Sequence, residues 1–135
     1  MEKVDLKGIY VLIIQVNKEL QLTIGALGKA KLKRGIYAYV GSAQKNLIHR
    51  VRRHLKKEKR KFWHIDYLLD SENVKVVEVR SKNGDKKEEC KIAQLIAKQG
   101  EAVEGFGVSD CHCTSHLFHI ESANFLEKET QIIKL

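Results

Sequence analysis

The stretch that most constrains the fold covers residues 35–55 and reads GIYAYVGSAQKNLIHRVRRHL. Near its start, Tyr37 and Tyr39 alternate with aliphatic residues, which is the period of a strand with two unlike faces. Gly41 and Ser42 predict the end of this strand, and Ser42 or Asn46 is a candidate cap for a following helix. The apolar stripe of that helix consists of Leu47, Ile48, Val51 and Leu55. We therefore expect a strand, a tight turn and a helix in immediate succession.

Two sides of this predicted helix carry different side chains. Arg50 and His54 are one turn apart and fall along one edge of the apolar stripe. The opposite, solvated side is expected to carry His49, Arg52, Arg53 and Lys56. Tyr39, at the end of the strand, should then lie close to Arg50 and His54. A hydroxyl, a guanidinium and an imidazole are groups that can hold and attack a phosphodiester.

The remaining segments predict an α/β (α+β) fold, with a small antiparallel sheet flanked by helices, in a single domain over residues 1–135. Strands are expected at residues 8–16 and 20–27, and with the strand that starts at residue 35 they would form an antiparallel sheet. The later elements are expected to be helices at 61–70 and 86–98, an edge-type strand at 74–80, a short strand at 117–120 and a polar helix or tail at 121–135.

One acidic residue of the third predicted helix is expected to face the protein interior. Glu89 shares a face with Ile92, Ala93 and Ile96 at helical spacing. A carboxylate on an apolar face is costly unless it is paired or binds a metal. Glu88 lies about a quarter turn away and has the position of an ordinary surface residue, although it stays an alternative metal ligand. Gly100 is expected to end this helix.

Three short motifs together resemble the GIY-YIG nuclease superfamily: Gly8-Ile9-Tyr10, Tyr39-Val40-Gly41 and Leu47-x-x-Arg50-x-x-x-His54. Residues 35–43, 63–69 and 105–118 are similar to its uncharacterised archaeal-type branch, a domain of unknown function. The two tyrosine motifs stand 29 positions apart, from Tyr10 to Tyr39, and a whole extra strand is expected between them.

This resemblance implies a GIY-YIG-like fold and a hydrolytic site. Tyr10, Tyr39, Arg50 and His54 would be catalytic, with a tyrosine or the histidine helping to deprotonate a water and Arg50 steadying the phosphate. Glu89 would hold one Mg²⁺ or Mn²⁺ ion, a role that suits a single carboxylate completed by waters and substrate oxygens. The structural alternative is a pair of strand tyrosines packed on a helix, with Arg50 bonded to a backbone carbonyl.

The basic charge is concentrated beside this predicted site. Residues 45–61 hold nine basic and one acidic side chain, and the rest of the chain holds sixteen of each, so this segment accounts for the net charge of +8. Such a cluster favours nucleic acid, DNA before RNA, over a merely solvated helix face. The predicted nucleic-acid-binding residues are Lys45, Arg52, Arg53, Lys56, Lys57, Lys59, Arg60 and Lys61. Trp63 and Tyr67 follow, and either stack on unpaired bases or pack in the core.

A second candidate site lies in a loop near the C-terminus, within residues 105–119. Cys111, Cys113 and His116 could bind Zn²⁺, with His112 or His119 as a fourth ligand, and Cys113 with His116 could act as a nucleophile pair. The C-x-C spacing is shorter than the usual C-x-x-C and there is no second cysteine pair. We therefore favour a structured loop that flanks the substrate groove.

Composition narrows the functional classes. No apolar run approaches the roughly 20 residues of a membrane span, and the first residues lack the apolar core of a signal peptide, so we expect a cytoplasmic protein. Three cysteines argue against a disulfide framework. The expected function is a divalent-metal-dependent endonuclease that acts on DNA in repair or processing. The alternative is a catalytically silent DNA- or RNA-binding module that works with a partner repair enzyme.

Overall fold

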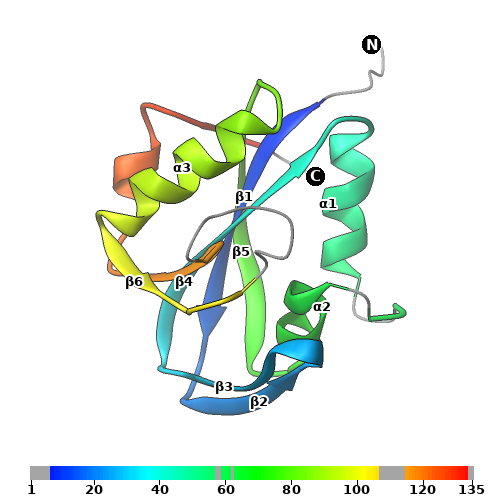
Figure 1. Cartoon of the computed structure of the whole chain (residues 1–135), viewed down its shortest axis with the longest axis vertical. Coiled ribbons are helices and arrows are strands. Elements are labelled where there is room, and N and C mark those ends of the chain that lie inside the picture. Colours follow the sequence, from blue (N-terminus) through cyan, green and yellow to red (C-terminus); the bar gives the residue numbers. More distant parts are fainter. Residues whose placement is uncertain (1–6, 57–58, 62, 107–114, 134–135) are drawn as a thin grey trace.

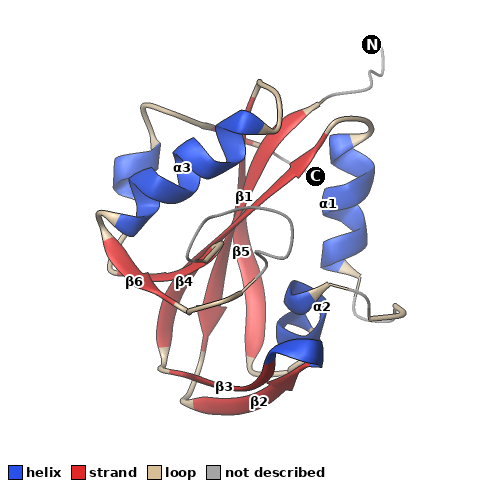
Figure 2. Cartoon of the chain, viewed as in Figure 1, coloured by secondary structure: helices blue, strands red, loops and turns tan. Residues whose placement is uncertain are grey.

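The computed structural model describes residues 7–56, 59–61, 63–106 and 115–133. These residues form an α+β fold around an antiparallel sheet of six strands in the order β6-β7-β4-β1-β5-β8 (Figures 1 and 2). The strands are β1 (Gly8–Val16), β4 (Gly35–Ala43), β5 (Val74–Lys82), β6 (Gly100–Ala102), β7 (Leu117–Ile120) and β8 (Gln131–Ile132). The helices are α1 (Leu47–Leu55), α2 (His64–Leu69) and α3 (Lys87–Ala97). The expected fold class is therefore confirmed.

Both faces of the sheet are covered. Strand β1 sends Tyr10, Leu12 and Ile14 into one core cluster and the intervening Ile9, Val11 and Ile13 into the other. Helices α1 and α2 pack on the first face and α3 packs on the second, so the two helical layers lie on opposite sides of the sheet (Figure 1). A strand that is buried on both faces needs apolar side chains on both, which explains the run of apolar residues from Ile9 to Ile14 in β1.

The prediction that the first three strands form one sheet is wrong. Strand β2 (Leu20–Ile24) pairs with β3 (Gly28–Leu32) in a separate two-stranded sheet, and β1 pairs directly with β4. The physical reason is that the strand at residues 20–24 has only one apolar face, whereas a strand inside this sheet needs two. In β2 the side chains of Gln21 and Thr23 are exposed while Leu20 and Ile24 are buried, so this strand can cover a core but cannot lie inside the sheet. A short 3₁₀ turn, η1 (Gly25–Leu27), replaces the predicted end of the second strand.

The register of β1 and β4 brings the two tyrosine motifs together despite their separation in sequence. Tyr10 lies opposite Gly41, and Leu12 lies opposite Tyr39. The strand does not end at Gly41, as the sequence pattern predicts, but continues to Ala43. Helix α1 then begins at Leu47, and Asn46 before it takes a left-handed conformation, with φ of 52°, and makes no side-chain cap bond.

The C-terminal segments differ in three details from the expectation. Helix α3 ends at Ala97, and Gly100 starts β6 instead of ending the helix. In place of a terminal helix the chain forms a 3₁₀ turn, η2 (Asn124–Leu126), and β8. The strand β8 pairs with Arg80 and Ser81 of β5, so β5 is not an edge strand along its whole length. Leu126 is buried, and this docking explains why a polar segment stays on the domain.

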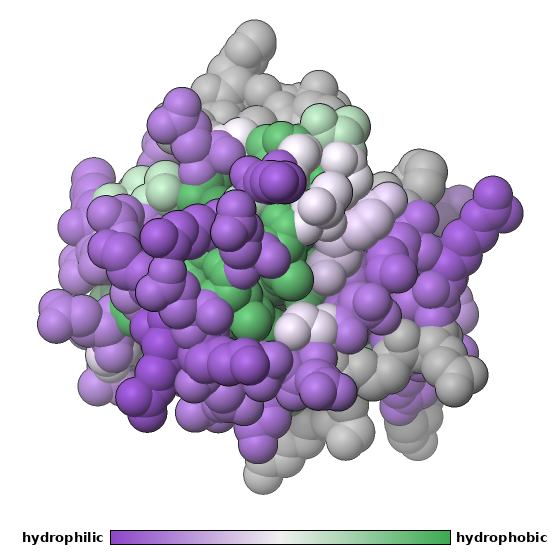
Figure 3. All heavy atoms as spheres, turned by 90° about the horizontal axis from the view of Figure 1, so that it is seen from below, coloured by the Kyte–Doolittle hydropathy of each residue, from purple (hydrophilic) through white to green (hydrophobic). Residues whose placement is uncertain are grey.

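No helix in the described residues is both long and apolar enough to cross a membrane. Seen from the end that carries β2 and β3, the surface is mostly hydrophilic, with apolar atoms visible in a hollow near its centre (Figure 3).

Candidate active site

The centre of the site is a hydrogen bond between the first motif tyrosine and the helix histidine. The Tyr10 hydroxyl lies 2.8 Å from His54 Nε2, and both side chains are about 2% exposed. Burial lowers the pKa of His54 to about 4, with Asp66 opposing this shift, so the imidazole is neutral at neutral pH. Burial raises the pKa of Tyr10, and the Arg50 guanidinium opposes that rise. The pair is therefore a phenol hydrogen-bonded to a neutral imidazole, and the tautomer of His54 decides which of the two donates.

Tyr39 lies beside this pair on the same face of the sheet. Its ring meets those of His54 and Phe106 edge to face, with centroids 6.3 and 6.0 Å away. Burial raises the pKa of Tyr39 well above its ordinary value. Gly41 completes this side of the site, because a Cβ there would lie 2.4 Å from the Tyr10 hydroxyl oxygen. Only glycine leaves room for the Tyr10 ring at this position.

Ser42, at the end of β4, links the two helices to the site. The Arg50 guanidinium donates a hydrogen bond to the Ser42 carbonyl at 3.0 Å, and the Ser42 hydroxyl donates to Glu89 Oε1 at 3.2 Å. The sequence pattern indicates Ser42 only as a helix cap, and this role in the site was not predicted. The carbonyl contact of Arg50 is the one that the structural alternative requires. It also fixes the guanidinium close to Tyr10, where it opposes the rise that burial causes in the Tyr10 pKa.

Glu89 faces inward, as its helical spacing predicts, and is 8% exposed. Its Oε2 lies 3.2 Å from Nδ1 of His116, a buried residue that the sequence analysis names as a possible zinc ligand. Glu88 instead points to the surface and pairs with Lys82 and Lys91. Of the two candidate carboxylates, Glu89 is the one whose charge reaches Tyr10 and Tyr39, because it adds to the rise that burial causes in the pKa values of both tyrosines.

The donor set limits what metal the site could hold. Among the described residues no group of three or more His, Cys, Asp or Glu side chains is placed to hold an ion. Each carboxylate oxygen of Glu89 has two lone pairs, so its contacts with Ser42 and His116 leave coordinating capacity. One carboxylate with waters and phosphate oxygens is a fitting set for Mg²⁺ or Mn²⁺ bound together with substrate.

A fully buried carboxylate that the sequence did not single out stands behind His54. Asp66 of α2 is 0% exposed, and its oxygens accept two hydrogen bonds from the Arg53 guanidinium at 3.0 and 3.1 Å. The Trp63 backbone N–H also donates to Asp66, at 2.9 Å. The prediction that Arg53 lies on the solvated side of α1 is wrong, because its guanidinium is drawn across to this buried charge. An acid at the third position of a helix signals its cap at the N-terminus, but it does not reveal the pairing with Arg53.

The comparison with known families bears on the whole of this arrangement. Residues 9–134 match the model of one protein family, the domain of unknown function DUF123. The chain belongs to this family. No curated protein and no solved structure matches the chain. The DUF123 match includes Tyr10, Tyr39, Arg50, His54 and Glu89, so the entire cluster lies inside the family domain.

The predicted nucleic-acid-binding residues of this DUF123 domain surround the cluster unevenly. Lys45, Arg52, Lys56, Arg60 and Lys61 are exposed, whereas Lys57 lies outside the described residues. Lys59 donates to the His54 carbonyl at 2.9 Å, and Arg53 is held by Asp66. Trp63 is partly buried under the guanidiniums of Arg50 and Arg53, whose central carbons lie 4.9 and 4.6 Å from the ring centroid.

Trp63 and Tyr67 were expected either to stack on bases or to pack in the core. Both rings pack against the core, and the Tyr67 ring lies against Gly25. The Lys61 ammonium lies over the Tyr67 ring, 5.9 Å from its centroid. The packing interpretation thus holds for both residues, and contact with bases stays a prediction.

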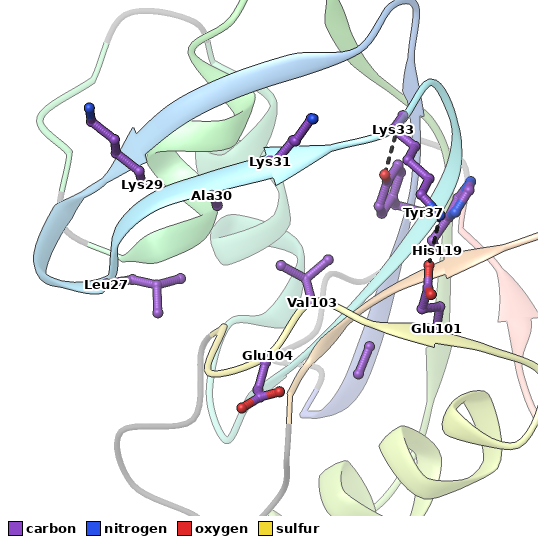
Figure 4. Close-up of a pocket in the computed structure, with 11 residues that line it drawn as sticks. Leu27, Lys29, Ala30, Lys31, Lys33, Tyr37, Glu101, Val103, Glu104 and His119 are labelled. Atoms are coloured by element: carbon purple, nitrogen blue, oxygen red, sulfur yellow. Dashed lines mark hydrogen bonds and ion pairs between the residues drawn. The ribbon is translucent and has the colours of Figure 1, made fainter.

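A pocket of about 310 Å³ lies elsewhere on the same face of the sheet, between β3 and β6 (Figure 4). Lys29, Lys31 and Lys33 line one side, and Tyr37 stacks on His119 with ring centroids 4.7 Å apart. Its charges are mixed, because Lys33 pairs with Glu101 at 3.6 Å and Lys31 pairs with Glu19 at 3.2 Å. None of the five clustered residues lines this pocket, so it is separate from the candidate site.

The zinc prediction falls mostly outside the described residues. Cys111, His112 and Cys113 lie in a segment of the chain that is not described. His116 is described, and its Nδ1 faces Glu89. His119 faces Tyr37 in the separate pocket, so these two histidines point to different places.

Proposed function

We propose that this domain is a divalent-metal-dependent endonuclease of the GIY-YIG type, with DNA favoured as its substrate and repair or processing as its setting. The observation that carries the proposal is the buried Tyr10–His54 hydrogen bond, with Arg50 and Glu89 close enough to shift the pKa of Tyr10. A neutral proton-accepting pair beside a cation and a carboxylate has the groups needed for phosphodiester hydrolysis.

The chain's own groups would act in the following way. A water oxygen attacks phosphorus, and the bond from phosphorus to the leaving oxygen breaks. The water gives a proton to the Tyr10 oxygen while Tyr10 passes its own proton to His54 Nε2, which later releases it to solvent. The leaving oxygen keeps the electron pair of the broken bond and takes a proton from solvent. This transfer suits Tyr10, because its raised pKa keeps it a phenol at neutral pH.

Arg50 and Glu89 would stabilise the negative charge that develops on the phosphate. The guanidinium is held in place by the Ser42 carbonyl and can donate to phosphate oxygens with its other N–H groups. Glu89 would hold Mg²⁺ or Mn²⁺, which when bound withdraws negative charge from the phosphate.

The test is cleavage of DNA by the purified full chain with Mg²⁺ or Mn²⁺, on linear, nicked and branched substrates. We expect Glu89→Gln and Arg50→Ala each to lower the cleavage rate at least about 100-fold, as for loss of one preorganised charge-stabilising group. The matched control is Glu88→Gln, which removes a neighbouring surface carboxylate and should keep the wild-type rate. Equal cleavage by all variants, or none by the wild type on any substrate, would contradict the proposal.

The second candidate is a binding module without turnover. It is favoured by one observation, the hydrogen bond from Arg50 to the Ser42 carbonyl, which gives the guanidinium a structural role. A module of this kind binds DNA or RNA with an affinity that Glu89→Gln leaves unchanged, and it cleaves nothing with either metal. Binding that does not weaken with added salt would contradict this interpretation.

A further inference from the structure

A continuous line of buried groups runs from the surface of α1 to the Tyr10 hydroxyl. Arg53 donates to Asp66, Asp66 faces Nδ1 of His54, and Nε2 of His54 meets Tyr10. The exposed fractions of Asp66, His54 and Tyr10 are 0, 2 and 2%. In such a line the proton positions on each member are set by its neighbours.

The two nitrogens of His54 have unequal partners. Nε2 has the Tyr10 hydroxyl at 2.8 Å, whereas Nδ1 is buried without a hydrogen-bond partner among the described residues. The carboxylate that Nδ1 faces is Asp66 Oδ1, at 3.9 Å. This separation is beyond a hydrogen bond, yet it is short enough for strong attraction between an N–H and a buried carboxylate. A lone pair on Nδ1 would instead point at the negative charge.

Asp66 cannot easily turn away from His54. Its two oxygens are held by the Arg53 fork at 3.0 and 3.1 Å, and the Trp63 N–H binds Oδ2 at 2.9 Å. These bonds compensate the negative charge of the carboxylate and fix its orientation. The carboxylate is therefore a fixed part of the wall behind the imidazole.

We propose that Asp66 is a positioning residue for Tyr10, because it keeps the proton of neutral His54 on Nδ1 and so leaves Nε2 to accept the Tyr10 proton. The inference rests on the proposed function for its catalytic meaning, since a hydroxyl proton directed at His54 leaves the lone pairs of Tyr10 free for the attacking water. With the opposite tautomer, Nε2 would donate to Tyr10 and the proton transfer described above would be blocked.

A purely structural role for Asp66 is the competing explanation. The carboxylate also caps the first turn of α2 and joins α1 to α2 through Arg53. In that case the tautomer of His54 would follow Tyr10 alone, or would be the one usual for a free imidazole. The two explanations differ in a property that can be measured without any activity.

The experiment determines the His54 tautomer by long-range proton–nitrogen NMR of the uniformly ¹⁵N-labelled full chain at pH 7, with the signals assigned through His54→Gln. The expected result is a protonated Nδ1 and an unprotonated Nε2. A protonated Nε2 in the wild type overturns the inference.

Three variants separate the influence of Asp66 from that of Tyr10. Tyr10→Phe removes the hydroxyl, and we expect His54 to keep its proton on Nδ1; a move to Nε2 overturns the inference. Asp66→Asn is expected to move the proton to Nε2, and an unchanged tautomer in the folded variant overturns the inference. Asp70→Asn is the matched control, since Asp70 is an exposed acid at the end of the same helix that pairs with Lys61, and it should change nothing. Should Asp66→Asn not fold, the wild type and Tyr10→Phe still decide.

The rate of DNA cleavage by Asp66→Asn connects the His54 tautomer to the proposed function. Asp66→Asn should lower kcat about 100- to 10,000-fold, the range of general acid–base contributions, with unchanged affinity for uncleaved DNA. A folded variant that keeps the wild-type kcat overturns the inference. If the wild type cleaves no DNA, the proposed function fails but the tautomer measurement still tests the positioning by Asp66. If the wild type cleaves DNA and His54 carries its proton on Nε2, the inference about Asp66 fails together with the proton transfer from Tyr10 to His54, while the proposed nuclease function stands.

Discussion

Among single residues, His54 combines two properties that seldom occur together, near-complete burial and a titratable ring. Its neutral form is compatible with the core because Tyr10 supplies a hydrogen-bond partner for Nε2. Its charged form would lose hydration that the buried surroundings do not replace. Its protonation state therefore connects the candidate site to the stability of the domain.

The pKa of His54 predicts how stability depends on pH. The ordinary pKa of 6.5 falls to about 4 in the folded chain, so the unfolded chain binds the proton more readily between these values. The stabilisation of the folded state that comes from neutral His54 is present above pH 6.5 and is lost as the pH falls toward 4. We expect the wild type to lose up to about 3 kcal/mol more than His54→Gln over this range. Urea unfolding of both proteins across the range checks this, and parallel curves would contradict it.

Gly41 gives a second prediction for a single residue. An added methyl group would lie 2.4 Å from the Tyr10 ring carbon that carries the hydroxyl, so Gly41→Ala should destabilise the domain by about 1–3 kcal/mol through overpacking. Removal of the ring relieves this overlap. The free energies of unfolding of Gly41→Ala, Tyr10→Ala and the double variant measure the coupling, and the double variant should lose less than the sum of the single losses. Strict additivity would show that the two positions do not touch.

Among the elements, α1 and α2 are joined by an ion pair across their interface. The Arg53 side chain is 28% exposed and Asp66 is fully buried, so the carboxylate depends on this partner for most of its compensation. This contact explains why a short helix of six residues, α2, can keep a fixed position against α1. It also places Trp63 beside both arginines of the site.

Removal of the arginine from this pair should be costly. Arg53→Gln leaves the Asp66 charge buried without its cation, and we expect a loss of about 3 kcal/mol in the free energy of unfolding. The matched control is Arg52→Gln, an exposed neighbour on α1, which should change stability by less than about 0.5 kcal/mol. Chemical denaturation measures both. Similar losses for the two variants would mean that the pair contributes nothing of its own.

The elements also show what the sequence could predict. Periodicity located β1, α1, α2 and α3, and the same spacing placed Glu89 inward, because each pattern depends only on local geometry. The pairing of β1 with β4 and the isolation of β2 depend on which strands must be buried on both faces, which is a property of the whole sheet. The role of Asp66 could not be predicted because its partners, Arg53 and His54, come from another helix. The hydrogen bond from Ser42 to Glu89 was not predicted, because the sequence pattern ends the strand at Gly41 and the strand in fact continues to Ala43.

At the scale of the whole molecule, the positive charge is placed on one side of the site. The exposed cations of α1 and the segment after it lie next to the cluster, while the lysines of β3 lie at the separate pocket. Two of the lysines at this pocket, Lys31 and Lys33, are paired with Glu19 and Glu101, so their positive charge is partly compensated. The contributions of the two groups of cations to binding can therefore be separated.

Two triple variants with equal changes in net charge test this asymmetry. Arg52→Gln with Lys56→Gln and Arg60→Gln should weaken DNA binding and flatten its salt dependence, by about 0.9 in the logarithmic slope for each phosphate that is no longer neutralised. Lys29→Gln with Lys31→Gln and Lys33→Gln should leave affinity and slope close to the wild type. Fluorescence anisotropy at several salt concentrations gives both values. Equal weakening would assign binding to net charge instead of to this surface.

The two ends of the six-stranded sheet have a consequence for behaviour at high concentration. The outermost strands, β6 and β8, have three and two residues, whereas the central β1, β4 and β5 have nine each. A foreign strand that docks on β6 or β8 would find only a few free N–H and C=O groups, because these two strands are short. On the β8 side, β5 itself is paired with β8 only at Arg80 and Ser81. Edge-to-edge joining of two copies is therefore limited at the two outermost strands of the sheet.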